Sequence, residues 1–267
     1  MAGIGIRTID GTLAPQTSGD LDLLRSSVRG SLCLPGEPGY DEARTIWNAM
    51  IDRRPAAVLR AAGAADVIQA VRFAADRRLL LSVRGGGHNI AGSAVCEGGL
   101  MLDLSLMDSI RVDPWSRTAR VEPGVRLGSL DRETQAFGLA TPLGINSTTG
   151  VAGLTLGGGF GWLSRKHGLT IDNLLSADIV TASGEMVRAS DADHPDLFWA
   201  IRGGGGNLGV VTSFEFRLHP VGPQVIAGLI VHPFSSAREV LRQYRVLAAQ
   251  APDELCCWAV LRKAPPL

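Results

Sequence analysis

Glycine gathers in three places along this chain, and these clusters constrain the fold more than any other feature. Many of the 33 glycines lie in Arg84-Gly-Gly-Gly-His88, in Gly150–Gly161 and in Gly203–Gly209. Glycine loses more conformational entropy on folding than other residues, so such runs occur where the backbone adopts positive φ or approaches another group closely. Successive N–H groups in such loops also form concavities that bind anions such as a diphosphate. One run alone is equally typical of a tight turn, but three together favour a large cofactor.

The third run contains the spacing G-x-G-x-x-G at Gly204, Gly206 and Gly209, which is the fingerprint of a nicotinamide-type Rossmann site. That fingerprint should follow a strand and open a helix. Here the expected helix Pro195–Ile201 comes before the run and the expected strand Val210–Leu218 comes after it. The order is reversed, so the sequence argues against a Rossmann domain.

Apolar periodicity predicts both helices and strands along the chain, in an α+β fold. Ser183-Gly184 predicts a hairpin turn between two of the strands. The expected helices are Asp41–Asp52, Asp66–Arg77, Leu127–Phe137 and Pro195–Ile201, and the expected strands are Ala57–Arg60, Leu79–Val83, Leu100–Leu104, Thr118–Val121, Ala177–Ala182, Met186–Ala189 and Val210–Leu218.

The two ends of the chain differ from this middle part. Residues 1–31 show little periodicity and many small polar residues, so we expect a leader and linker. After Pro220 and Pro223, a strand is expected at Val225–Val231 and then an amphipathic helix with Val240, Leu241, Tyr244, Leu247 and Ala248 on one face. These elements predict the opening of a second unit, residues 223–267.

Charge and composition exclude several classes of partner. The 26 basic and 26 acidic side chains give zero net charge, whereas affinity for nucleic acid needs a concentrated positive field. The most apolar stretch, residues 56–71, is interrupted by Arg60, Asp66 and Gln69, so no membrane span is expected. The N-terminus lacks the features of a secretory signal, which predicts a cytoplasmic protein. None of the four cysteines has metal-ligand spacing, and we interpret them as free thiols.

His88 is the strongest candidate for chemistry. It follows an expected strand and three glycines, which would hold its ring beside whatever the loop cradles, with Asn89 and Ser93 as further polar groups. A histidine in a loop is usually only solvated, but the flanking glycines favour a function. Neutral imidazole serves as a nucleophile or metal ligand, and no second ligand stands at zinc spacing. Attachment to a cofactor is therefore the better interpretation.

Several motifs of the chain resemble those of a known family. Val83-Arg-Gly-Gly-Gly-His-Asn89, Gly150-Val-Ala-Gly-Leu-Thr-Leu-Gly-Gly-Gly-Phe-Gly161 and Gly205-Gly-Asn-Leu-Gly-Val-Val211 are similar to motifs of the berberine-bridge-enzyme-like branch of the vanillyl-alcohol oxidase/p-cresol methylhydroxylase (PCMH) flavoproteins. The similarity runs from about Leu32 to Leu218, and it includes Gly39-Tyr-Asp41, Trp47-Asn48, Arg53-Arg54-Pro55, Ser164-Arg-Lys-His-Gly-Leu169 and Asp172-Asn173.

The resemblance implies a fold and a set of site residues. Residues 32–222 would form a PCMH-type FAD-binding domain of two α+β subdomains, and residues 223–267 the beginning of an incomplete substrate domain. His88 matches the histidine that bonds to the methyl carbon of the dimethylbenzene ring of FAD. The other cofactor-binding positions implied are Arg84, Gly85, Gly86, Gly87, Asn89, Gly92 and Ser93 in the first loop, Thr148, Gly150, Gly153, Gly157 and Gly161 in the second segment, and Val211 near the adenine.

The resemblance also implies a reaction, in which a small-molecule substrate passes a hydride to FAD and molecular oxygen reoxidises the flavin. Many relatives carry a cysteine that forms a second bond to the flavin, but Asn146 stands there, which predicts a single bond through His88. Relatives also continue beyond the length of this chain, so it looks truncated, and no catalytic base can be named in it. Two alternatives stay open, an oxygen-independent dehydrogenase and a flavin-binding fragment without turnover.

Overall fold

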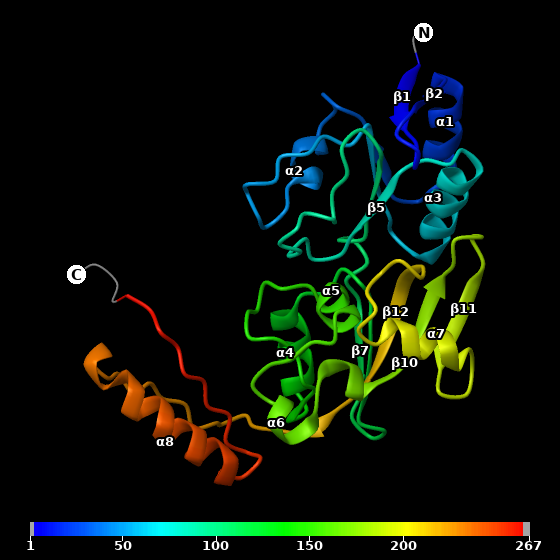
Figure 1. Cartoon of the computed structure of the whole chain (residues 1–267). Coiled ribbons are helices and arrows are strands. Elements are labelled where there is room, and N and C mark those ends of the chain that lie inside the picture. Colours follow the sequence, from blue (N-terminus) through cyan, green and yellow to red (C-terminus); the bar gives the residue numbers. More distant parts are fainter. Residues whose placement is uncertain (1–2, 264–267) are drawn as a thin grey trace.

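The computed structural model describes residues 3–263 and shows the expected α+β fold, with its two larger sheets in separate subdomains. Figure 1 shows the four-stranded sheet and its helices in the upper part of the molecule and the five-stranded sheet below it. The helix α3 (Ala64–Asp76) lies between them, because its residues contact β10 and β12 of the lower sheet as well as β6 of the upper one. The two subdomains therefore share one packed boundary.

The upper sheet has the strand order β3-β4-β6-β5, with β3 (Ser31–Cys33), β4 (Ala57–Arg60), β6 (Leu100–Asp103) and β5 (Leu81–Arg84). The strands β4, β6 and β5 are parallel, whereas β3 runs antiparallel to β4. All four residues of β6 are buried, as a parallel strand covered on both faces requires. This arrangement brings the carboxyl ends of β5 and β6 to one edge, where the first glycine run begins.

The lower sheet is antiparallel, with the strand order β11-β10-β12-β8-β7. Phe214 and Phe216 of β12 are buried, while Glu215 between them points to the opposite face. The elements of this subdomain are β7 (Ile110–Asp113), β8 (Thr118–Val121), α4 (Leu127–Gln135), β9 (Leu139–Ala140), α5 (Val151–Leu156), α6 (Ser164–His167), the 3-10 helix η1 (Thr170–Asn173), β10 (Leu174–Val180), β11 (Met186–Ser190), α7 (Pro195–Ile201), β12 (Val210–Arg217) and β13 (His219–Pro220). The hairpin turn predicted at Ser183-Gly184 is confirmed, since β10 and β11 are antiparallel neighbours.

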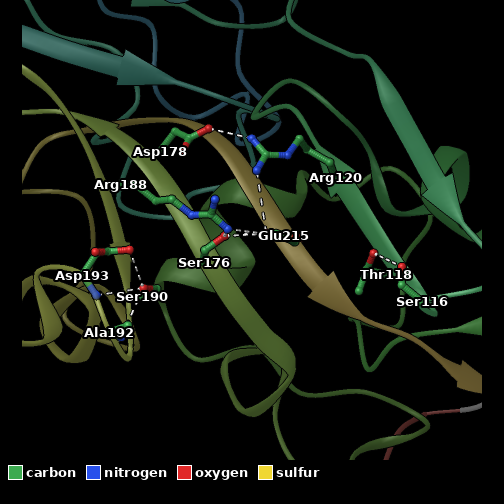
Figure 2. Close-up of polar contacts among 10 residues, drawn as sticks. All are labelled: Ser116, Thr118, Arg120, Ser176, Asp178, Arg188, Ser190, Ala192, Asp193 and Glu215. Atoms are coloured by element: carbon green, nitrogen blue, oxygen red, sulfur yellow. Dashed lines mark hydrogen bonds and ion pairs between the residues drawn. The ribbon is translucent and has the colours of Figure 1, made fainter.

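Charged side chains cover the polar face of this lower sheet (Figure 2). Arg120 lies 2.8 Å from Asp178 and 3.7 Å from Glu215, and Arg188 lies 2.9 Å from Glu215. Ser176 donates to the same Glu215 carboxylate. Partly exposed ion pairs stabilise a fold only weakly. This network nevertheless links side chains on the four neighbouring strands β8, β12, β10 and β11. The face opposite the core is thus a solvated one.

The expected leader is wrong, because the segment before residue 32 is folded. β1 (Ile4–Arg7) and β2 (Leu13–Gln16) form a hairpin, and α1 (Ser18–Ser27) follows. Ile6, Leu21 and Leu24 belong to the core of the upper subdomain. The helix begins with a capping box between Thr17 and Asp20, a signal that was present in the sequence.

Two further expectations need correction. The helix expected over Asp41–Asp52 is shorter, and only α2 (Tyr40–Arg44) is helical. The chain after it leaves the helix because it runs beside the loop that contains His88. The strand expected at Val225–Val231 is irregular and exposed, since it pairs with no strand within residues 3–263, and unpaired N–H and C=O groups stay in water. The helix after it is confirmed as α8 (Ala237–Gln250), preceded by the 3-10 helix η2 (Phe234–Ser236).

The helix α8 lies apart from both sheets in Figure 1 and contacts the lower subdomain through α6. Arg165 donates to the carbonyl oxygens of Ala248 and Ala251 at the end of α8. Trp258 stacks on Trp162 with ring centroids 4.7 Å apart. No helix within the described part of the chain is long and apolar enough to cross a bilayer.

Candidate cofactor site

The first and second glycine runs meet backbone to backbone. A β-carbon at Gly150 would lie only 2.6 Å from the Cα atom of Gly86, and one at Gly86 would overlap Gly150 in turn. A β-carbon at Gly85 would lie 2.9 Å from the carbonyl oxygen of Pro123. Side chains are therefore excluded at these positions, and the close approach explains why the sequence has glycine there.

The third run joins the second one at the end of α5. The N–H group of Gly205 donates to the carbonyl oxygen of Leu156 over 3.0 Å. Val211 lies further on, near the start of β12, and its buried side chain belongs to the core of the lower subdomain. The structure thus brings the three runs into a continuous series of contacts, whereas the Val211 side chain is buried in the core.

His88 is held from two directions where the first two runs meet. Its imidazole stacks on the indole of Trp47 with ring centroids 5.4 Å apart and an angle of 22° between the planes. Its Nε2 atom lies 3.2 Å from the Oγ1 atom of Thr148. Burial lowers the pKa of His88 below its ordinary value and the positive charge of Arg126 lowers it further, while a backbone hydrogen bond with Thr148 acts in the opposite direction. The imidazole is therefore neutral near pH 7.

The position of the proton on His88 follows from its neighbours. Thr148 donates its backbone N–H to Oδ1 of Asn146 over 3.0 Å, which identifies that atom as the amide oxygen. The hydroxyl of Thr148 donates to the same oxygen over 2.8 Å. Since its only hydrogen is used there, Thr148 accepts from the Nε2–H group of His88. The lone pair is then on Nδ1, to which no group within residues 3–263 donates a hydrogen bond.

The rest of the first loop is built by local turns. Gly87 and Gly92 adopt positive φ of +70° and +72°. Asn89 accepts a hydrogen bond from the backbone N–H of Ser93 over 3.1 Å. The side chains of Asn89 and Ser93 are both exposed. Asn89 therefore shapes the turn after His88.

The remaining glycines of the second segment fall into two kinds. Gly153 and Gly157 are exposed at α5, and a β-carbon at Gly153 would meet open space. Gly161 is buried against Leu143, with no room for a side chain. Packing explains Gly161, whereas Gly153 has no packing reason to be glycine.

A cavity of about 240 Å³ lies at the carboxyl ends of β5 and β6. Ligands of open α/β sheets commonly bind at this end of parallel strands. Two guanidinium groups and two hydroxyls would suit a phosphate in this cavity. Its lining residues are Arg84, Gly85, Ser105, Asp108, Gly124, Val125, Arg126 and Ser129.

Asp103 fixes Arg84 at the rim of this cavity. Its fully buried carboxylate lies 3.1 Å from Arg84 and 3.3 Å from Arg60, and it accepts from both the N–H and the hydroxyl of Ser105. Arg60, Asp103 and Arg84 stand at the same register of three neighbouring strands. The Nε atom of Arg84 is buried and has no hydrogen-bond partner among the described residues, which is an exception that calls for an explanation.

These features fit FAD. Bare glycine backbone suits a close-lying dinucleotide, the two arginines suit its diphosphate, and the free Nδ1 atom suits a bond to its flavin. No group of three or more potential metal ligands occurs among residues 3–263.

Three residues that shape this site are not among those predicted from the sequence to bind the cofactor. Asp103 is a charged residue at the end of the apolar run Leu100–Leu104, which signals a paired carboxylate on a buried strand. Trp47 was part of the family motif, but its contact with His88 depends on a chain crossing that spacing does not reveal. Arg126 gave no signal in the sequence.

The fold and site define a class, a flavoprotein domain in which two α+β subdomains hold FAD. The chain belongs to the FAD binding domain family, whose model matches residues 55–190. Its relatives are FAD-linked oxidases of the vanillyl-alcohol oxidase/p-cresol methylhydroxylase superfamily.

Individual relatives agree with this assignment. The (R)-6-hydroxynicotine oxidase of Paenarthrobacter nicotinovorans is 43% identical over 204 residues, which are 76% of this chain and 44% of that protein. The crystal structure of 6-hydroxy-D-nicotine oxidase from Arthrobacter nicotinovorans superposes with a TM-score of 0.71 at 44% identity, covering 73% of this chain and 43% of the other. Glucooligosaccharide oxidase from Acremonium strictum, described with 6-S-cysteinyl, 8α-N1-histidyl FAD, gives a TM-score of 0.70 at 32% identity, covering 74% and 42%. The chain spans less than half the length of these relatives.

Proposed function

We propose that this chain is the FAD-binding part of a flavin-dependent oxidase and that it carries FAD covalently through His88. The observation that supports this most is the state of His88, a neutral imidazole with a free Nδ1 atom at the meeting point of two glycine runs. Neutral imidazole with an exposed lone pair is a competent nucleophile.

The attachment step balances with oxygen as the oxidant. A bond forms between a ring nitrogen of His88 and the methyl carbon of the dimethylbenzene ring. The methyl carbon and the imidazole each lose one hydrogen, and the two protons and two electrons pass to molecular oxygen, which becomes hydrogen peroxide. The residues of the chain contribute position and protonation state, and Nε2 keeps its contact with Thr148 during the approach.

We propose a single bond to the flavin. Asn146 stands where bicovalent relatives have cysteine, and its amide oxygen is occupied by Thr148. Cys96 is the nearest thiol in sequence, but it is buried and burial raises its pKa, so the reactive thiolate is disfavoured. Both observations agree with attachment through His88 alone.

For the whole protein we propose oxidation of a small organic molecule at carbon. Bound FAD would accept a hydride from the substrate and pass the electrons to oxygen. The relatives named above act on a hydroxynicotine and on glucooligosaccharides, so their substrates span amines and sugars. The residues of this chain hold and orient the flavin, and they do not select between these substrate classes.

Reoxidation of the flavin tests the oxidase assignment without a known substrate. The 267-residue chain loaded with FAD would be photoreduced without air and then mixed with oxygenated buffer in a stopped-flow instrument. An oxidase predicts rapid return of the oxidised flavin spectrum with one hydrogen peroxide per flavin. Slow reaction with oxygen together with fast reaction with a quinone dye would instead indicate a dehydrogenase and reject the proposal.

A further inference from the structure

The segment 46–51, which replaces the end of the expected helix, lies along the loop 87–92 that contains His88. Four contacts join the two, and they are spread over both segments. The contacts are Ile46 against Gly87, the N–H of Trp47 donating to the carbonyl oxygen of Gly87 over 3.0 Å, the side chain of Asn48 donating to the carbonyl oxygen of Ile90 over 2.8 Å, and Ile51 against Gly92. This segment therefore braces the loop.

The indole of Trp47 is not placed there by core packing. The buried cluster beside it contains Ile46 and takes in Ile51 at its edge, but it does not include Trp47. The residue is 58% exposed, and its ring stacks on His88. Leaving so much indole in water is unfavourable, so a contact outside the core is the better explanation for the residue.

Trp47 and Thr148 restrict different motions of His88. The stacked indole limits tilting of the imidazole plane. Thr148, held by Asn146, limits rotation within that plane and keeps the proton on Nε2. The pair thus holds His88 in a geometry in which Nδ1 is free, without any ligand being bound.

We propose that Trp47 and Thr148 are positioning residues that preset His88 for the formation of its bond to FAD. This inference rests on the proposed function, since it concerns the same bond. Holding reacting atoms near the attack geometry before the step lowers the barrier, because less freedom is lost on reaching it. The electrons and hydrogens balance as given above, with oxygen as the oxidant.

The rate of flavin attachment tests this proposal in the full 267-residue chain. Flavin-free protein would be mixed with FAD in air, samples would be stopped in acid, and flavin retained on the precipitated protein would be measured against time. Trp47→Ala and Thr148→Val should each attach flavin about fivefold more slowly, since an aromatic contact or hydrogen bond contributes about 1 kcal/mol. Trp47→Phe and Thr148→Ser keep the stack or the hydroxyl, and both should restore the rate to within about twofold of the unaltered chain.

Two readouts separate positioning from general damage. Trp115 is 92% exposed on the turn between β7 and β8, so Trp115→Ala is a matched loss of an indole and should attach flavin at the unaltered rate. Rapid noncovalent binding of FAD, followed by quenching of its fluorescence, should stay within about twofold in the Trp47 and Trp115 variants, because the glycine loops are intact.

The outcomes distinguish this proposal from the proposed function. Unchanged attachment in Trp47→Ala and Thr148→Val would overturn the positioning role, and so would equal slowing in Trp47→Phe or a parallel loss of noncovalent binding. If the unaltered chain binds FAD but never retains it in acid, the covalent function itself is wrong and the positioning role falls with it.

Discussion

At the scale of single residues, Asp103 is the group whose removal should cost most. Its buried carboxylate accepts from Arg60, Arg84 and Ser105. Removing one partner of a buried ion pair leaves the other charges uncompensated, so Asp103→Ala should lower the free energy of unfolding by about 3 kcal/mol. Asp108→Ala is the control, because Asp108 is exposed on the rim of the same cavity and should change stability by less than about 0.5 kcal/mol. Equal urea midpoints for the two variants would contradict this account.

A second feature at this scale is a stacked pair of histidines. The rings of His167 and His219 are 3.9 Å apart and 14° from parallel. Asn173 donates to the carbonyl oxygens of His167 and Leu169, so its amide oxygen faces Nε2 of His219, 2.6 Å away. Nε2 of His219 is therefore the donor, and Asn173 links the two histidines.

The pair predicts acid sensitivity. Burial lowers the pKa of both rings below 6.5, with a further contribution from Lys166 at His167 and from His167 and Arg217 at His219, while Glu254 acts in the opposite direction on His167. The unfolded chain then binds more protons near pH 6, so stability is present above pH 6.5 and is lost as pH falls through the lowered values.

We expect the free energy of unfolding to decrease from pH 7 to pH 5, and to decrease less in His219→Gln, whose amide still donates to Asn173. His232→Gln provides the control, since this exposed histidine lies outside the pair. Urea titrations at several pH values measure the effect. The same pH dependence in His219→Gln and in the unaltered chain would show that the pair does not cause it.

At the scale of elements, the glycines at the helix α5 differ in whether packing requires them. Gly153 lies inside α5 with open space around its missing β-carbon. Glycine destabilises a helix interior by about 1 kcal/mol relative to alanine, so Gly153→Ala should raise the melting temperature of the flavin-free chain. If FAD approaches the backbone here, the same change should weaken FAD binding.

Gly150→Ala is the matched comparison, because its β-carbon would lie 2.6 Å from Gly86. It should lower the melting temperature and also disturb the His88 loop. Thermal unfolding without FAD and fluorescence titration with FAD measure both effects. If the Gly153→Ala chain is more stable and binds FAD normally, the idea that FAD approaches the backbone of α5 is wrong.

The elements also show what the sequence could predict. Strands such as β4 and β8 coincide with their predicted bounds, because period and composition agree within them. Residues 45–52 do not continue the expected helix, since Ile46 and Ile51 pack against the loop of His88 while Met50 is 91% exposed. The same spacing of apolar residues can belong to a helix face or to a loop that packs against another segment. Which of the two forms depends on that distant segment, so the local sequence cannot decide it. The glycine runs could be predicted to form one site. The contact between Gly86 and Gly150 could not be predicted, because it is a tertiary contact between residues far apart in the sequence.

At the scale of the whole molecule, the segment after β13 leaves apolar side chains in water. Val225, Ile226, Leu229, Ile230 and Val231 are all exposed. Contiguous apolar surface of this kind favours association, so we expect the 267-residue chain to form oligomers as its concentration rises.

Replacing Ile226 and Ile230 together by aspartate should reduce this association, whereas Gln224→Asp, which adds charge without removing apolar surface, should reduce it much less. Light scattering coupled to size-exclusion chromatography over a range of concentrations measures the effect. An unaltered chain that remains a monomer throughout would show that the exposed segment does not associate.

The most direct test of the central claim is the chemical state of the flavin on the unaltered chain and on His88→Ala. Both proteins would be loaded with FAD, precipitated with acid and digested, and the flavin-bearing peptides would be identified by mass spectrometry. We expect the unaltered chain to stay yellow, with the flavin on one peptide that contains His88, and His88→Ala to release all its flavin. Complete release from the unaltered chain, or flavin on a Cys96 peptide or retained by His88→Ala, would contradict attachment through His88.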